Sequence, residues 1–202
     1  MIDVEAVTRL HQTTTGRWHQ HGVDNPYGDF LLLVCRQHEQ NYRLWHQEDV
    51  ARSPDVADAE LAQVKRNIDK LNQQRNDLIE QLDDYLIGQL QIVGVEPCPE
   101  GRLNTETPGC VIDRLSILAL RIYHMQEQAA RADATPQHRA KAKARLEVLR
   151  QQHADLCRSL GELLEDVFSG RKRLKVYRQF KMYNDPTMNP YLYQAGKRPT
   201  AT

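Results

Sequence analysis

Polar and charged side chains recur at helical spacing along residues 26–52, on a face that begins as an apolar stripe. Phe30, Leu31 and Val34 start this stripe. At about 100° per residue, the same face continues as His38, Asn41, Trp45, Glu48, Asp49 and Arg52. Such a face predicts a lined cavity if the helix stays inside the protein, and a solvated end if the helix emerges after two turns.

The segment that follows Pro108 carries a second polar stripe. Apolar residues cover most of its circumference, which is typical of a helix buried on nearly all sides. One narrow stripe of this helix nevertheless holds Asp113, Arg114, Arg121 and His124. Because burying an unpaired charge costs several kcal/mol, this stripe predicts either a ligand site or a structural network of ion pairs.

The long segment that follows Pro54 contributes a third polar set. Its leucine and isoleucine stripe contains Asn72 and Arg75 near the middle of the helix. An arginine in that position cannot easily extend its charged end to the surface, as one near a helix end can. Ligand sites in helical bundles are built from polar side chains on facing helices. We therefore expect the three sets to meet in one inward-facing pocket.

Anion binding is the first chemistry that these residue types suit. The guanidinium group is permanently charged and makes two parallel hydrogen bonds to a phosphate or carboxylate. The cations available for this role are Arg75, Arg114, Arg121 and Lys181. Trp45 would offer a flat face to a sugar or a base. The carboxylates that would orient the arginines or hold ligand hydroxyls are Glu48, Asp49 and Asp113.

An acid–base or metal centre is the second interpretation, because histidine transfers protons near neutral pH and also binds zinc or manganese. Its members would be His38, Asp49, Asp113 and His124. No HExxH or ExxH spacing accompanies them, so no metal is predicted, and any cofactor is unknown. The histidines at positions 11, 19 and 21 are expected to decorate a solvated N-terminal helix and loop. Ser116 is expected on a buried helix without an evident base, which argues against nucleophilic catalysis.

The third interpretation is structural: the polar stripes are internal ion pairs that fix the register of the helices. The protein would then be a scaffold or a partner-binding module. In that case the tyrosine-bearing tail from Lys181 to Tyr193 would be a docking segment. We prefer a strap that packs back across the bundle, because it would bring Lys181 and Tyr183 to the same pocket.

The elements that position these residues are helices marked by a capping residue followed by proline. Proline at the first helical position loses nothing, because its missing N–H would be unpaired there anyway. The four pairs are Asn25-Pro26, Ser53-Pro54, Thr107-Pro108 and Thr135-Pro136. They predict helices near 26–52, 55–92, 108–132 and 136–169, with shorter helices near 3–20 and 172–184. Residues 93–106 are the one long connection, 185–202 should be irregular, and no strand pattern is seen.

Composition narrows the class of protein. The chain has 202 residues with 27 basic and 27 acidic side chains, so no charge excess suggests a nucleic-acid partner. The first 25 residues are polar, and the longest apolar run, Phe30 to Cys35, is too short to span a bilayer. The four cysteines lack ligand spacing and are expected to be reduced thiols in a cytoplasmic protein. We expect an all-α, single-domain helical bundle of four long helices, with short terminal helices and an unknown oligomeric state.

Several strings of the sequence resemble those of an uncharacterised bacterial family, the domain of unknown function numbered 4254. They are His38-x-x-Asn41-x-x-x-Trp45-x-x-Glu48-Asp49-x-Ala51-Arg52, Asn104-x-Glu106-Thr107-Pro108-Gly109, Asp113-Arg114-Leu115-Ser116-Ile117-Leu118, Tyr123-His124-Met125 and Tyr177-Arg178-Gln179-Phe180-Lys181-Met182-Tyr183-Asn184-Asp185-Pro186. The resemblance covers roughly residues 30–193 and implies a helical domain with no established activity. It also implies a link to genes for cell-envelope sugar polymers, and it transfers no catalytic residues.

The predicted function is a helical bundle whose inward polar pocket binds a small anionic or sugar-containing ligand, without a nucleic-acid or membrane partner. It could extend to an enzyme of envelope-glycan or nucleotide-sugar metabolism, and the alternative is a structural or interaction protein. The candidate catalytic residues are Asp49, Asp113 and His124. The candidate ligand-binding residues are His38, Asn41, Trp45, Glu48, Arg52, Asn72, Arg75, Arg114, Arg121, Lys181 and Tyr183.

Overall fold

The computed structural model describes residues 2–96, 99–179, 182 and 185–194, and it confirms the predicted all-α class. The long helices are α1 (Val4–His21), α2 (Asp29–Ala51), α3 (Asp58–Ile92), α4 (Pro108–Ala130) and α5 (Pro136–Phe168). A single turn, α6 (Pro190–Tyr193), lies in the C-terminal segment. Two short strands, β1 (Arg102–Leu103) and β2 (Lys172–Arg173), pair in parallel.

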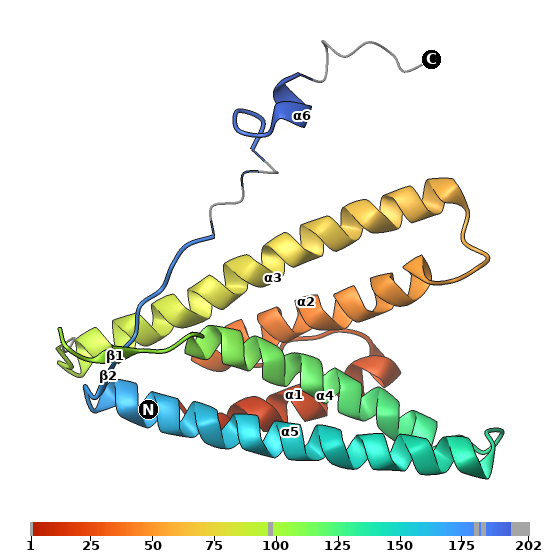
Figure 1. The fold of residues 1–202 in the computed structure, drawn as a ribbon, viewed down its shortest axis with the longest axis horizontal. Helices are drawn as coiled ribbons and strands as arrows, with labels where there is room; N and C mark the ends of the chain where they lie inside the picture. Colours follow the sequence, from red (N-terminus) through yellow and green to blue (C-terminus); the bar gives the residue numbers. More distant parts are fainter. Residues whose placement is uncertain (1, 97–98, 180–181, 183–184, 195–202) are drawn as a thin grey trace.

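Helices α2 to α5 form two antiparallel hairpins, which pack against each other through α4. α2 packs along α3, and α4 packs along α5. The two hairpins lie close together near β1 and β2 and diverge toward the opposite end of the molecule (Figure 1). α4 also contacts α2, α3 and α1, so it forms the common wall between the hairpins. Polar side chains from α2, α3 and α4 can therefore meet between the two hairpins.

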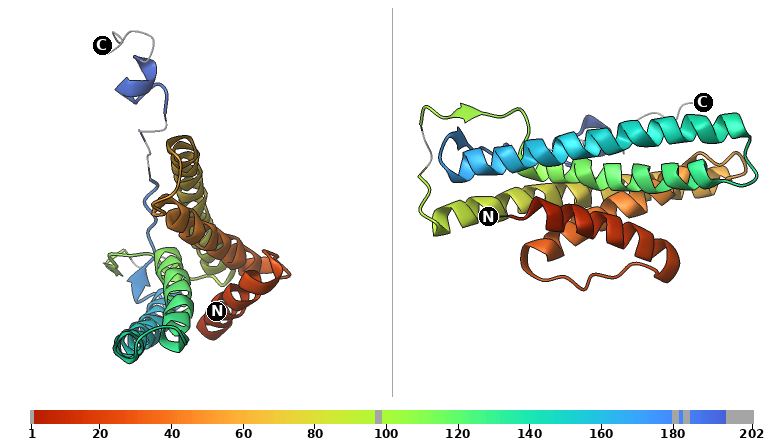
Figure 2. Two further views of the ribbon diagram at one scale, coloured as in Figure 1. Left: turned by 90° about the vertical axis from the view of Figure 1, so that its right-hand side faces the viewer. Right: turned by 90° about the horizontal axis from the view of Figure 1, so that it is seen from below.

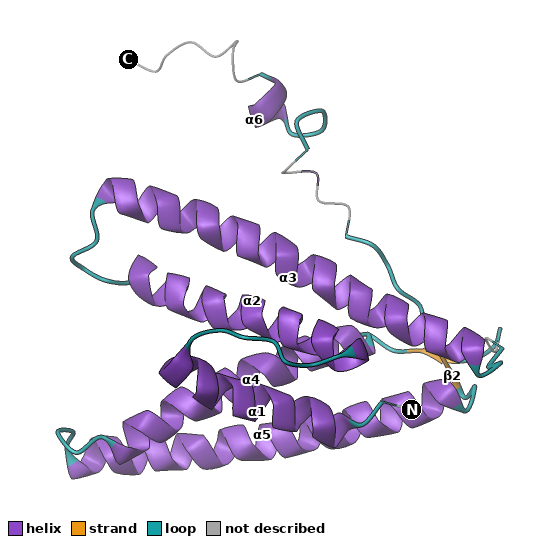
Figure 3. Ribbon diagram, turned by 180° about the vertical axis from the view of Figure 1, so that it is seen from behind, coloured by secondary structure: helices purple, strands orange, loops and turns teal. Residues whose placement is uncertain are grey.

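α1 covers one side of this arrangement. It contacts α4, α2 and α5, and an end-on view shows it beside the two hairpins (Figure 2). From behind, α1 lies over α4, and the connection from α1 to α2 runs along the same side (Figure 3). The main core lies beneath it, with Val7, Val34, Leu115 and Leu160 fully buried. α1 thus buries polar residues of α2 and α4 from behind.

Two of the four predicted helix starts are confirmed. The Thr107 hydroxyl accepts a hydrogen bond from the backbone N–H of Cys110, and the Thr135 hydroxyl accepts one from His138. The predicted starts at residues 26 and 55 are wrong, because α2 and α3 each begin about three residues later. The Asn25 side chain holds the preceding loop, donating to the carbonyl of Leu32 and accepting from the N–H of Tyr27. There the Asx-Pro pair makes a turn, not a cap.

The start of α4 packs unusually closely on α3. Asp83 accepts a hydrogen bond of 2.7 Å from the N–H of Gly109, so a carboxylate on α3 satisfies a free donor of the first turn of α4. A Cβ atom at Gly109 would lie 2.6 Å from the carbonyl oxygen of Ile79. Burial raises the pKa of Asp83 to about 6, although hydrogen bonds from Thr107 and Gly109 oppose this shift. This contact anchors the wall that both hairpins share.

The predicted helix over 172–184 is wrong for the described part of that range. Gly170, with φ of +74°, ends α5, and residues 172–173 then form β2. The Arg173 guanidinium donates to the carbonyl of Gly101, and Arg178 forms ion pairs with Glu80 and Asp84 on α3. These contacts hold the segment extended along α3. The expectation of no strand fails here too, although each strand has only two residues.

Two further expectations concern the cysteines and the membrane. Cys35, Cys110 and Cys157 are free thiols, while Cys98 lies outside the described residues. Of the helices that the structure describes, none combines the length and the apolar character that crossing a bilayer requires.

Candidate functional site

A cavity of about 390 Å³ lies between α2, α3 and α4, on the side where the hairpins diverge. Three apolar residues contribute to its lining: Leu44, Ile117 and Leu120. The other eight lining residues were all predicted as site residues from the sequence: Asn41, Trp45, Glu48, Asp49, Arg52, Asn72, Arg75 and Arg121. The face of α2 that turns polar after residue 34 therefore lines a cavity for part of its length, and residues 49 and 52 at its end are exposed.

Asp113 lies behind the cavity wall and joins the three helices. Its Oδ1 accepts hydrogen bonds from the side-chain amides of Gln37, at 2.5 Å, and Asn41, at 2.8 Å. The Nε of Arg75 on α3 lies 3.8 Å from the same oxygen. The Asp113 residue is 8% exposed, and this burial raises the pKa of its carboxyl group despite the opposing charge of Arg75. Asp113 is thus one step removed from the cavity, through Asn41 and Arg75.

His38 is fully buried and continues the network toward α1. Thr15 donates its hydroxyl hydrogen to the carbonyl of His11, so its oxygen accepts a hydrogen bond from Nε2–H of His38 at 3.0 Å. In this tautomer Nδ1 of His38 is the acceptor for the hydroxyl of Ser116, at 2.7 Å. Ser116 in turn accepts from Asn41 at 2.9 Å. Burial lowers the pKa of His38 to about 3, consistent with a neutral ring.

Two predictions about this network are corrected. His38 was predicted to bind ligand, but its ring is fully buried and both its nitrogens already have partners. Ser116 was predicted to lack a base, yet its hydroxyl donates to His38. Ser116 is fully buried, so this pair organises the interior and does not face the cavity.

The arginines differ in their partners. Arg52 pairs with Glu48 one turn away at 2.9 Å, and Arg75 approaches Asp113. The buried Nε of Arg75 makes no hydrogen bond. Arg121 lines the cavity, and no hydrogen bond or ion pair joins it to another described residue. Arg114 does not line this cavity: its side chain is 54% exposed and pairs with Glu106 in the preceding loop.

His124 stands behind the cavity, not in its wall. Its ring stacks on Trp45 with centroids 4.6 Å apart and planes at 11°, and its Nδ1 contacts Glu127 at 2.8 Å. The rings of His19 and His46 lie 5.1 Å and 6.3 Å from that of His124. His124 therefore supports the orientation of Trp45. Its predicted catalytic role would require a ligand to reach past the indole ring.

The expectation that the three N-terminal histidines are solvated is wrong at two positions. His11 is fully buried beside His38, with ring centroids 4.8 Å apart, and neither of its nitrogens has a hydrogen-bond partner. His19 is partly buried, stacks on Tyr123 and bonds to the carbonyl of Thr15. His21 is exposed, as expected. Within the described ranges, no group of three or more His, Cys, Asp or Glu side chains is arranged to hold a metal ion.

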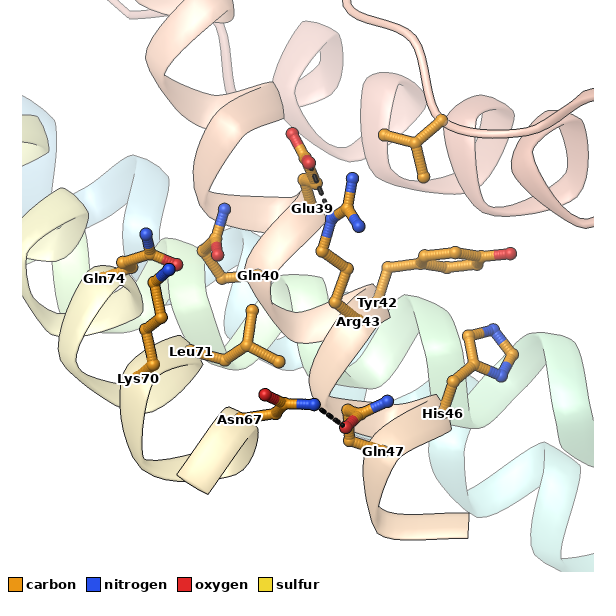
Figure 4. A pocket seen from close by; sticks show the side chains of 11 residues that line it. Glu39, Gln40, Tyr42, Arg43, His46, Gln47, Asn67, Lys70, Leu71 and Gln74 are labelled. Atoms are coloured by element: carbon orange, nitrogen blue, oxygen red, sulfur yellow. Dashed lines mark hydrogen bonds and ion pairs between the residues drawn. The ribbon is translucent and has the colours of Figure 1, made fainter. Parts of the chain in front are cut away.

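A larger hollow of about 600 Å³ lies on the other side of the contact between α2 and α3 (Figure 4). Much of its polar lining is already paired. Glu39 binds Arg43 at 2.7 Å, and Asn67 donates to Gln47 at 3.0 Å. The buried hydrogen bonds around Asp113 lie next to the smaller cavity instead. We therefore take the smaller cavity as the candidate site.

Other site predictions fall outside the described residues or were missed. Lys181 and Tyr183 belong to the part of the chain that is not described. Tyr191 and Tyr193 are more than half exposed, so the described tyrosines of the tail do not close a pocket. Sequence reasoning missed Gln37 and Thr15. Gln37 lies one turn before Asn41 on α2, and that spacing could have indicated a shared partner.

Comparison with known proteins gives a family but no characterised relative. No curated protein and no solved structure matches the chain. Residues 32–176, most of the chain, match the family described as "Protein of unknown function (DUF4254)". This range contains every lining residue of the cavity and the three residues that contact Asp113, which are Gln37, Asn41 and Arg75. The chain belongs to the DUF4254 family.

Proposed function

We propose that the cavity between α2, α3 and α4 binds a small ligand that carries a phosphate or carboxylate group and a sugar. The observation that carries this proposal is a pair of arginines on the cavity wall whose guanidinium groups have donors without a protein partner. The buried Nε of Arg75 has no hydrogen-bond partner, and Arg121 has no partner among the described residues. An oxyanion in the cavity would give both arginines a partner, because guanidinium groups bind such groups with two parallel hydrogen bonds.

The rest of the lining suits a sugar. Asn72 and the carboxylate of Asp49 can bind hydroxyl groups, and Trp45 offers an aromatic surface fixed from behind by His124. A volume of about 390 Å³ is within the range of small-ligand pockets, roughly 300–1,000 Å³. The resemblance noted above to a family linked with envelope sugar polymers makes sugar phosphates and nucleotide sugars the first ligands to test.

The test compares Arg121→Ala with Arg36→Ala. Both arginines are exposed helical residues without an ion pair among the described residues, so neither change should unfold the protein. A panel of sugar phosphates, nucleotide sugars and inorganic anions is screened by thermal shift, and hits are titrated calorimetrically. We expect Arg121→Ala to weaken binding by about tenfold to a hundredfold, the loss of one charge-assisted hydrogen bond. Arg36→Ala should bind like the wild type.

A structural role is the second candidate, and one observation favours it. The contacts of Gln37, Asn41 and Arg75 with Asp113 connect α2, α3 and α4 without any ligand. If this were the network's entire purpose, no anion in the panel would raise the melting temperature. Cells carrying Arg121→Ala would then behave like wild type, because Arg121 takes no part in that network.

A further inference from the structure

The proposed ligand would bind next to the buried carboxylate of Asp113, whose negative charge is opposed by one nearby cation, Arg75. Asp113 is 8% exposed, and Arg75 is the cation that approaches it, at 3.8 Å. The same guanidinium lines the cavity and keeps an unpaired Nε. One arginine therefore stands between a buried acid on α4 and the space for an anion.

We propose that an oxyanion and a proton bind this site together, the oxyanion at Arg75 and the proton at Asp113. This inference rests on the proposed function, since it presumes that an anion enters the cavity. The proton comes from solvent. It goes to Oδ2, because Oδ1 already accepts hydrogen bonds from Gln37 and Asn41.

The direction of the coupling follows from electrostatics. An anion near Asp113 repels its negative charge, and an anion that draws Arg75 away removes the opposite charge that favours ionisation. Both effects raise the affinity of Asp113 for a proton. Burial has already raised the pKa of this carboxyl group above its ordinary value, so a further rise moves it toward neutral pH. By linkage, protonated Asp113 must bind the anion more tightly than ionised Asp113.

Asp113 contacts polar and charged groups on α2 and α3. From α3 the facing charge is Arg75, and from α2 the facing groups are the amides of Gln37 and Asn41. His38 is one hydrogen bond further away, through Ser116. The cavity itself is also lined by Glu48 and Asp49 on α2 and by Arg52 and Arg121. Because Glu48 and Asp49 also respond to an anion, the contribution of Asp113 must be isolated by substitution.

The substitution Asp113→Asn isolates the contribution of Asp113 to the pH dependence of anion binding. The amide keeps an oxygen for Gln37 and Asn41 but cannot change charge, so it imitates protonated Asp113 at every pH. Sulfate is the probe, because it stays a dianion between pH 5 and 8. We expect the affinity of the wild type for sulfate to fall as pH rises. The fall should reach up to about tenfold per pH unit between the pKa of Asp113 in the free protein and its pKa in the sulfate complex. Asp113→Asn should lose this part of the dependence and, at pH 8, bind about as tightly as the wild type at low pH.

Calorimetry in two buffers with different ionisation enthalpies counts the protons directly. The wild type should take up as much as one more proton per sulfate than Asp113→Asn, and thermal melting confirms that the variant is folded. Sulfate that binds in an Arg75-dependent way, with equal proton uptake and equal pH profiles in both proteins, overturns the coupling while the anion site stands. Sulfate binding that is absent, or unaffected by Arg75→Ala, overturns the anion site itself.

Discussion

The hydroxyl group of Ser116 serves two buried partners at once. It donates to Nδ1 of His38 and accepts from the amide of Asn41, which also donates to Asp113. A buried donor or acceptor that loses its partner costs about 1–3 kcal/mol. The single hydroxyl therefore affects both the fold and the orientation of the cavity wall at Asn41.

Ser116→Ala should accordingly lower the free energy of unfolding by about 1–3 kcal/mol, because it leaves Nδ1 of His38 without a donor. Urea denaturation at pH 7.5 measures this change. Ser159→Ala on α5 is the matched control, since Ser159 is exposed and alanine favours a helix. Equal stability of the two variants would mean that the hydrogen bonds of Ser116 contribute nothing net.

Residue types on the polar faces could be predicted from the sequence, but side-chain directions could not. Arg114 and Arg121 are seven residues apart and so lie on nearly the same side of α4. Arg121 lines the cavity, whereas Arg114 extends to Glu106. The difference arises because Arg114 lies near the start of α4, within reach of the preceding loop. Helical periodicity does not encode that proximity.

Helix boundaries show the same limit at the scale of elements. A threonine followed by proline marks α4 and α5 correctly, because those threonines accept hydrogen bonds from the first turn. The Asn25-Pro26 and Ser53-Pro54 pairs precede their helices by a turn. Both uses of proline satisfy its fixed φ angle, so local sequence cannot separate them. The segment after α5 is extended because of ion pairs with α3, which are tertiary contacts.

The close contact between α3 and α4 makes Gly109→Ala informative. Alanine favours a helix over glycine by about 1 kcal/mol, but the new Cβ would lie 2.6 Å from the backbone oxygen of Ile79. We expect net destabilisation of about 1–3 kcal/mol by urea denaturation, because backbone must move to relieve the clash. Gly161→Ala on α5 meets nothing within 4 Å and should be neutral or stabilising. A Gly109→Ala protein as stable as Gly161→Ala would show that the helices separate at little cost.

For the whole molecule, α1 is the part that sequence reasoning placed least well. His11 was expected on a solvated face, yet it is buried together with Thr8 and Thr15, beside Val7 and Trp18. Their spacing of three to four residues places them on one side of a helix, and this side faces α2 and α4. Polar residue types concealed a core face, because the hydroxyl groups of Thr8 and Thr15 donate to carbonyl groups of their own helix and so can be buried. Thr15 also accepts a hydrogen bond from His38 on α2.

Buried and partly buried histidines should make the protein sensitive to acid. Burial lowers the pKa of His11, His38, His46 and His153, so below about pH 6.5 the unfolded state binds more protons than the folded state. Stability then falls as pH decreases. The raised pKa values of Asp83 and Asp113 act in the opposite direction, because the folded state takes up protons there first. We expect the four histidines to outweigh the two carboxyl groups, so that the free energy of unfolding falls between about pH 6.5 and 5.

His11→Leu tests this balance, because His11 is fully buried and neither ring nitrogen has a partner. Each protein is unfolded with urea at pH 7.5, 6.5 and 5.5 and compared with its own value at pH 7.5, which removes any packing cost of the substitution. The loss of stability below pH 6.5 should be smaller in His11→Leu by up to about 1.4 kcal/mol per pH unit. His138→Gln, at an exposed position of α5, should keep the wild-type slope. If the free energy of unfolding of His11→Leu changes with pH as steeply as that of the wild type, protonation of His11 does not cause the loss of stability in acid. The loss must then arise at the other histidines whose pKa is lowered.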